Sequence, residues 1–208
     1  MELAIYIPAF VALFVVIDPI GLAPLFVALT QGMTPRQRRI IALRSSLVGL
    51  GVLTLFGVAG EAVLAFLGIS MPAFRMAGGI LLFLTALDML FERRAQRRQG
   101  QADKAEADHR DDPSVFPLAI PLIAGPGAIA TMILLTGQEG GDFTHVLLVH
   151  LVMVAVLAVV LALFLLSTPL ERVLGPTGIN VVTRLLGMLL AALSVQFVID
   201  GMRDLQVI

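Results

Sequence analysis

The chain has 208 residues, of which 58% are hydrophobic and 14% charged, with a formal net charge of -1 and a mean hydropathy of +0.97. This composition excludes a soluble globular domain and indicates an integral membrane protein. The apolar runs have the length of membrane helices and lack the two-residue alternation of barrel strands, which predicts an all-α protein. Cysteine is absent, which excludes disulfides and thiolate sites.

Six transmembrane helices are predicted, at about 20 apolar residues per crossing. In chain order they cover Leu3–Leu29, Ile40–Leu67, Pro72–Phe91, Val115–Thr136, Val146–Leu166 and Ile179–Met202. Before the second of them, Thr34 and Pro35 have the N-cap and first-turn identities that start a helix. The N-terminus lacks a basic region and a cleavage signal, so we expect the first helix to be retained in the protein.

The first and fourth predicted helices are each interrupted by proline and glycine. Asp18-Pro19 is followed by Gly21, and Gly125-Pro126 is followed by Gly127. Proline removes a backbone donor and glycine tolerates non-helical angles, so both helices are expected to break at mid-membrane. Backbone groups freed in hydrocarbon need protein, a polar cavity or a ligand to satisfy them, and paired breaks therefore point to a transport site.

The third and fourth helices are joined by the only long polar stretch of the chain. This stretch mixes acidic and basic residues without apolar periodicity, which predicts a solvated, mobile, charged cytoplasmic linker over residues 93–113. It separates residues 1–92 from residues 114–208, each with three predicted crossings.

The two halves are similar to each other in sequence. The run Arg75–Thr85 matches Arg184–Ser194, and Asp18-Pro19 aligns with Gly125-Pro126, at offsets of 109 and 107 residues. An odd number of crossings per half means that the second half enters the membrane in the opposite sense. The sequence therefore predicts two inverted-topology three-helix repeats.

Lysine and arginine set the expected orientation. Of the 14 basic residues, all except Arg75 and Arg203 fall on one side if the connection after the first helix is cytoplasmic. The positive-inside rule then places both termini on the non-cytoplasmic side of a bacterial inner membrane.

Asp18 is the only ionisable residue near the predicted bilayer centre, where an aspartate costs about 2.5 to 3.5 kcal/mol on insertion scales. One interpretation is that it binds the ammonium group of a substrate or a coupling cation. The other is that it caps the second half of the broken helix as an N-cap. The two roles are compatible.

Helix N-termini after the two breaks would present free amides and a partial positive charge, which favours a carboxylate. With Asp18 beside them, one pocket would bind both ends of an amino acid. The predicted substrate-binding residues are Asp18, Pro19, Ile20, Gly21, Leu22, Gly125, Pro126, Gly127, Ala128 and Thr131, and the predicted cavity-lining residues are Thr85, Ser194 and Gln196.

Other chemistry is not indicated. The three histidines lack metal-ligand spacing, and no nucleophile motif, phosphate loop or nucleotide fingerprint is present, so we predict no enzyme, no cofactor, no metal site and no nucleic-acid partner. H⁺ and Na⁺ remain open as coupling ions.

The Asp18–Pro24 and Ile120–Gly127 segments, together with Arg75, Gly78 and Gly79, resemble the MarC family of bacterial inner-membrane proteins. The resemblance covers essentially the whole chain. It implies a six-helix transporter of small neutral amino acids such as glycine and alanine. Alternatives are an exporter or channel for other small solutes or drugs, and a membrane regulatory protein without its own substrate.

Overall fold

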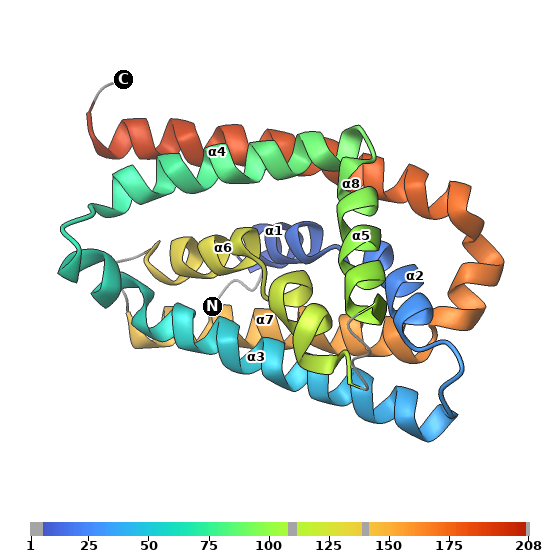
Figure 1. Ribbon diagram of the computed structural model, residues 1–208. Coiled ribbons are helices and arrows are strands. Elements are labelled where there is room, and N and C mark those ends of the chain that lie inside the picture. The colour runs from blue at the N-terminus through green and yellow to red at the C-terminus, as the bar shows by residue number, and fades with distance from the viewer. Residues whose placement is uncertain (1–5, 108–111, 139–141, 207–208) are drawn as a thin grey trace.

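A computed structural model describes residues 6–107, 112–138 and 142–206, and the described part is helical without any strand (Figure 1). Its elements are α1 (Ile7–Ile17), α2 (Pro19–Leu29), α3 (Pro35–Phe66), α4 (Met71–Leu90), α5 (Arg93–Ala107), η2 (Ser114–Ile123), α6 (Pro126–Thr136), α7 (Phe143–Leu165) and α8 (Ser167–Asp204). Within the described residues, five spans are long and apolar enough to cross a membrane, or six if η2 and α6 count as one bent span. The chain is therefore an all-α integral membrane protein.

The start of α3 follows from its sequence. The Thr34 hydroxyl accepts a hydrogen bond from the Gln37 amide at 3.3 Å, and the Gln37 side chain accepts one from the Thr34 amide at 2.9 Å. This reciprocal pair is a capping box, and Pro35 fills the first helical position, where no amide donor is needed. The helix consequently begins five residues before the predicted Ile40.

The chain leaves the helical path at Asp18, between α1 and α2. Asp18 has φ 58° and ψ 65°, a left-handed conformation that aspartate tolerates better than most residues, and Pro19 occupies the first position of α2. The depth of this break in a bilayer stays a prediction.

A second interruption separates η2 from α6, whose axes differ by 55°. Phe116 and Ile120 have non-helical angles within η2, and α6 begins at Pro126. A Cβ at Gly125 would lie 2.5 Å from the Pro121 carbonyl oxygen. Any residue other than glycine at this position would therefore require the backbone of the turn to shift.

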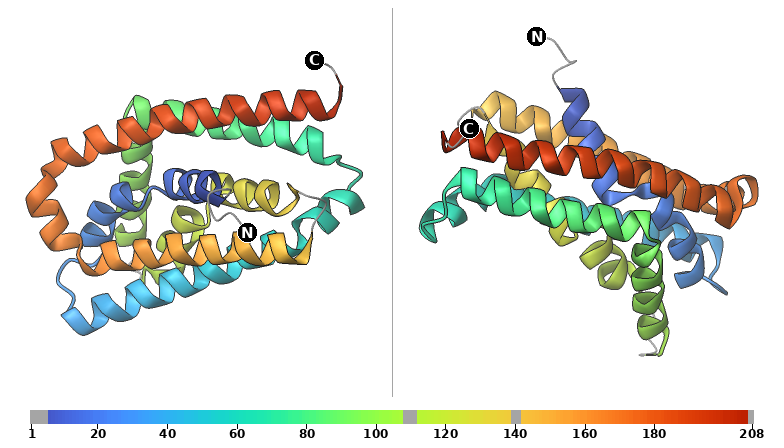
Figure 2. Two further views of the ribbon diagram at one scale, coloured as in Figure 1. Left: turned by 180° about the vertical axis from the view of Figure 1, so that it is seen from behind. Right: turned by 90° about the horizontal axis from the view of Figure 1, so that it is seen from above.

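Helices α4 and α8 lie side by side and antiparallel, as both views of Figure 2 show. Small residues allow the close approach: a Cβ at Gly79 would lie 2.7 Å from the Ser194 carbonyl oxygen, and one at Gly187 would lie 2.9 Å from Met89 Cβ. The matched runs Arg75–Thr85 and Arg184–Ser194 thus belong to one helix pair. Their relation by an inverted repeat stays a prediction.

The charged linker expected over residues 93–113 is largely helical, which was not predicted, while its solvation, mobility and cytoplasmic placement stay predictions. Most of its described part is the helix α5, which runs crosswise to α4 (Figure 1) and projects from the bundle in the right view of Figure 2. Its alanines, arginines and glutamines favour a helix. Arg98 within it is only 6% exposed, because its guanidinium bonds the end of α1. The division of the chain into residues 1–92 and 114–208 stays a prediction.

Candidate functional site

Asp18 is completely buried, and both of its carboxylate oxygens are engaged. Oδ1 accepts a hydrogen bond from the Gly21 amide at 3.1 Å, so Asp18 is the N-cap of α2. Oδ2 accepts one from Arg98 Nη1 at 2.8 Å in a buried ion pair. The partner of Asp18 in this structure is therefore an arginine that lies eighty positions later in the chain.

Arginines of α5 also close the end of α1. The last carbonyls of a helix have no intrahelical donor. Arg94 Nη2 donates to the Val16 carbonyl oxygen, and Arg98 Nη2 donates to that of Ile17 at 3.1 Å. Cations are also favoured by the partial negative charge of a helix C-terminus. The two guanidiniums thus satisfy the backbone groups that the break exposes.

Burial changes the proton affinity of these two arginines, which belong to a helix outside the candidate spans. Burial, together with the neighbouring Arg98 guanidinium, lowers the pKa of Arg94 to about 9. Burial also lowers the pKa of Arg98, although the Asp18 carboxylate opposes this shift. Arg94 remains charged at neutral pH.

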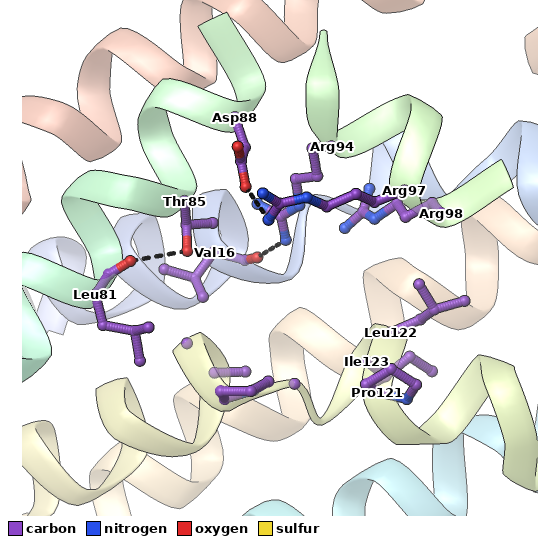
Figure 3. A pocket seen from close by; sticks show the side chains of 14 residues that line it. Val16, Leu81, Thr85, Asp88, Arg94, Arg97, Arg98, Pro121, Leu122 and Ile123 are labelled. Atoms are coloured by element: carbon purple, nitrogen blue, oxygen red, sulfur yellow. Dashed lines mark hydrogen bonds and ion pairs between the residues drawn. The ribbon is translucent and has the colours of Figure 1, made fainter. Parts of the chain in front are cut away.

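A cavity of about 280 Å³, here called the central cavity, lies between the ends of α1 and α4, helix α5 and the η2–α6 junction (Figure 3). Its polar groups come from Thr85, Asp88, Arg94, Arg97 and Arg98. Gly127 and Ala128, at the start of α6, also line it, and this helix has no side-chain cap. The free amides of α6 and several guanidinium groups therefore meet at one cavity.

A second cavity of about 190 Å³, the side cavity, lies between α2, α5 and α8. It is lined by Asp18, Gly21, Pro24, Arg94, Ala95, Arg98, Pro176, Ile179, Asn180 and Thr183. Arg94 and Arg98 line both this cavity and the central one. The two guanidiniums therefore stand between the two spaces.

A third cavity of about 310 Å³, the far cavity, lies at the opposite ends of α1 and α6, and its lining includes Tyr6, Gln138, His145, Gln196 and Asp200. His145 Nε2 lies 2.8 Å from the Leu135 carbonyl oxygen, which only accepts, so Nε2 carries the proton. The other ring nitrogen, Nδ1, lies 3.4 Å from the Tyr6 hydroxyl oxygen. Between the far and central cavities, α1 and α6 contribute the fully buried side chains of Leu13, Thr131 and Met132.

The family model for the MarC family integral membrane proteins matches residues 3–206 of the chain. The chain belongs to the MarC family. It is 38% identical over 202 residues to a UPF0056 membrane protein of Aquifex aeolicus, covering 97% of this chain and 94% of the relative. It is 35% identical over 197 residues to the UPF0056 inner membrane protein YhgN of Escherichia coli, covering 95% of each. No solved structure matches it. The family assignment made from the break motifs is confirmed.

In this MarC family member, the predicted site residues fall into separate groups. Thr85, Gly125, Pro126, Gly127 and Ala128 line the central cavity. Asp18 and Gly21 line the side cavity, and Gln196 lines the far cavity, where its amide donates to Asp200 Oδ1 at 2.8 Å. The amides after the two breaks thus open on different cavities, and the single pocket expected from the sequence is divided by Arg94 and Arg98.

The remaining predicted residues line none of these three cavities; they are Pro19, Ile20, Leu22, Thr131 and Ser194. Thr131 Oγ1 donates to the Gly127 carbonyl oxygen at 2.8 Å, and Ser194 Oγ donates to that of Ala191 at 2.7 Å. Both hydroxyls therefore bond within their own helices. Across the described residues, no group of three or more histidine, aspartate and glutamate side chains is placed to hold a metal.

Sequence reasoning missed Arg94 and Arg98. They are four positions apart, so a helix places both on one face. That spacing was a usable signal, but a segment rich in both charge signs was interpreted as solvated. Asp88, near the end of α4, was not among the predicted site residues and also lines the central cavity.

Gly21→Ala is expected to destabilise the protein by about 1 to 3 kcal/mol through overpacking. The added Cβ would lie 2.2 Å from Asp18 Oδ2 and 3.0 Å from Arg98 Nη1, so it would push the ion pair apart. Chemical denaturation in detergent measures the change. Gly51→Ala is the matched control, because a Cβ there meets nothing within 4 Å. If the two variants have the same denaturation midpoint, Gly21 is not packed against the Asp18 carboxylate as described.

Proposed function

We propose that this MarC family member is a secondary transporter of small neutral amino acids, with the substrate bound in the central cavity. The observation that carries the proposal is the meeting of Arg94, Arg98 and the start of α6 at a cavity that also holds Asp88. A zwitterion is bound by a positive group at its carboxylate and a negative group at its ammonium end, and the lining of this cavity supplies both.

The carboxylate end has two sets of donors. Guanidiniums bind carboxylates through charge-assisted hydrogen bonds. The amides of Gly127 and Ala128 add the positive end of the α6 dipole. Since Arg94 and Arg98 are held from the other side by the carbonyls of Val16 and Ile17, their charges are already oriented when the substrate arrives.

The ammonium end is assigned to Asp88 and Thr85 in place of Asp18. Both oxygens of Asp18 are engaged by Gly21 and Arg98, whereas among the described residues Asp88 forms an ion pair with Arg97 alone, whose side chain is 71% exposed. An exposed ion pair contributes about 0 to 1 kcal/mol, so Asp88 can exchange that partner for a substrate ammonium group.

The size and lining of the central cavity favour a small side chain. Its volume of about 280 Å³ is below the range of about 300 to 1,000 Å³ typical of pockets for drug-sized ligands. Val16, Leu81 and Pro121 supply apolar walls. These features support glycine- or alanine-like substrates over drugs.

The placement of the cavities supports alternating access. The central and far cavities lie at opposite ends of α1 and α6, and the buried residues between them interrupt any continuous path. A channel would need that path to be open, so this arrangement favours a transporter in which α1 and α6 move.

We also propose that both termini lie on the non-cytoplasmic side of the inner membrane, as the positive-inside rule indicates. Arg75 pairs with Asp204 at the end of the bundle away from α5, while Arg38, Arg44 and the arginines of α5 belong to the other end. A reporter enzyme that works only outside the cytoplasm should therefore be active when it is fused to the C-terminus.

Binding of three compounds to purified protein tests the function. Alanine carries both charged groups, propionate lacks the ammonium group and ethylamine lacks the carboxylate. We expect alanine to bind saturably, and propionate and ethylamine to compete at least about ten-fold more weakly, because each loses a charge-assisted bond of about 1.5 to 3 kcal/mol. Repeating the measurement with and without Na⁺, and at several pH values, identifies the coupling ion.

Two outcomes would contradict this function. Propionate binding as tightly as alanine would show a carboxylate site without amino acid selectivity. No saturable binding of glycine or alanine would remove the amino acid assignment altogether.

A further inference from the structure

We propose that the side cavity is a second binding station for the substrate, reached from the central cavity through an exchange of ion pairs at Arg94 and Arg98. This inference rests on the proposed function and adds a site to it. The side cavity has its own polar lining, from Asp18, Asn180 and Thr183, in addition to the two arginines.

The shared arginines provide the route. Arg94 and Arg98 line both cavities, and the side chain of Arg98 is only 7% exposed. A carboxylate bound to Arg94 in the central cavity can therefore pass to Arg98 and enter the side cavity without leaving the two cations, and Arg94 can then receive the carboxylate of a second substrate molecule. Such a path avoids an unpaired charge in a buried setting, which would cost several kcal/mol.

Asp18 completes the exchange. Its Oδ2 is bonded to Arg98 Nη1 at 2.8 Å in the absence of substrate. When a substrate carboxylate takes that guanidinium, the Asp18 oxygen is released toward the side cavity that it lines. It then pairs with the substrate ammonium group, so the one pair between Asp18 and Arg98 is replaced by two pairs, one between Arg98 and the substrate carboxylate and one between Asp18 and the substrate ammonium group.

An unused hydrogen-bonding group also points to a polar occupant. Thr183 Oγ1 is buried and has no partner among the described residues. Within the described part of the chain, the contact of Asn180 Nδ2 is a long one of 3.5 Å to Glu92 Oε1. Buried polar atoms without partners are uncommon in proteins, and a zwitterion in the side cavity would give both groups a partner.

The test is the number of alanine molecules bound per chain. Equilibrium dialysis with radiolabelled alanine is performed in a maltoside detergent, which carries no phosphate headgroup that could occupy the arginines. We expect two molecules per wild-type chain. Ala95→Leu fills the side cavity from α5 without changing any charge, and it should reduce the number to one.

A milder variant and a matched control separate the two stations. Thr183→Val removes only the unused hydroxyl and should weaken one of the two binding events by roughly ten-fold to over a hundred-fold, as expected for one hydrogen bond to a charged group. Thr85→Val is the same substitution in the central cavity, where the hydroxyl donates to the Leu81 carbonyl oxygen at 3.0 Å and can still accept a bond from the substrate, so it should affect the other event. Unchanged unfolding midpoints show that each variant is folded.

The outcomes distinguish this inference from the proposed function. One alanine per wild-type chain overturns the second station and leaves the transporter intact. Two molecules that both persist unchanged in Ala95→Leu and Thr183→Val also overturn it, because the second molecule would then lie elsewhere. No alanine binding at all overturns the proposed function itself.

Discussion

Replacing Arg98 by methionine is expected to lower the free energy of unfolding by about 3 to 5 kcal/mol, because it leaves the carboxylate of Asp18 buried without its cation. Asp18 is completely buried and the side chain of Arg98 nearly so, so water cannot replace the lost partner. Two further features are lost with the guanidinium, namely the bond to the Ile17 carbonyl and the support of the α1 C-terminus. Denaturant unfolding in detergent measures the effect.

Two variants show whether the effect comes from the buried charge. The double variant Arg98→Met with Asp18→Asn should recover most of the stability, since asparagine still caps α2 and carries no charge. Arg97→Met removes an arginine from the same helix whose ion pair with Asp88 is exposed, and it should cost at most about 1 kcal/mol. If Arg97→Met and Arg98→Met destabilise the protein equally, the Asp18 pair is not buried as described.

Replacing Arg94 by methionine is expected to weaken alanine binding by roughly ten-fold to over a hundred-fold, the equivalent of one charge-assisted hydrogen bond of about 1.5 to 3 kcal/mol. Arg94 lines the central cavity and is held at the Val16 carbonyl. Methionine keeps the helix propensity and much of the length of the side chain, so the loss of charge is the main change.

Arg93→Met is the matched control for that measurement. Arg93 is adjacent in sequence, but its guanidinium lies over the ring of Phe91, 5.8 Å from the centroid, and it lines none of the three cavities described above. Its alanine affinity should equal that of the wild-type protein. An Arg94→Met variant that is folded and binds alanine normally would show that Arg94 supports α1 without contacting substrate.

Local signals explain what could be predicted from the sequence. Apolar length located the spans, Thr34 and Pro35 marked the start of α3, and Asp18-Pro19 carried the N-cap and the first-turn proline of α2. The capping interpretation of Asp18 was therefore available from neighbouring residues alone. Each of these features depends on interactions within a few positions along the chain.

The remaining features depend on contacts between distant segments. The charge of Asp18 implied a buried partner, but its identity required the position of α5, whose composition is typical of a solvated segment. Likewise, the division of one expected pocket into a central and a side cavity results from where two long arginine side chains end. Neither position follows from periodicity or motif spacing.

The ion pair between Asp18 and Arg98 also has a consequence for the assembly of the protein in the cell. The two residues are 80 positions apart, so at about 5 to 20 residues per second the carboxylate is synthesised roughly 4 to 16 s before its arginine. If Asp18 lies at the predicted mid-membrane depth, the first three candidate spans enter the membrane during that interval with an uncompensated charge, which costs about 2.5 to 3.5 kcal/mol on insertion scales. We therefore expect the first helix to reach its final position only after α5 has been made, and a chain that ends before Arg98 to leave the Asp18 carboxylate without its cation.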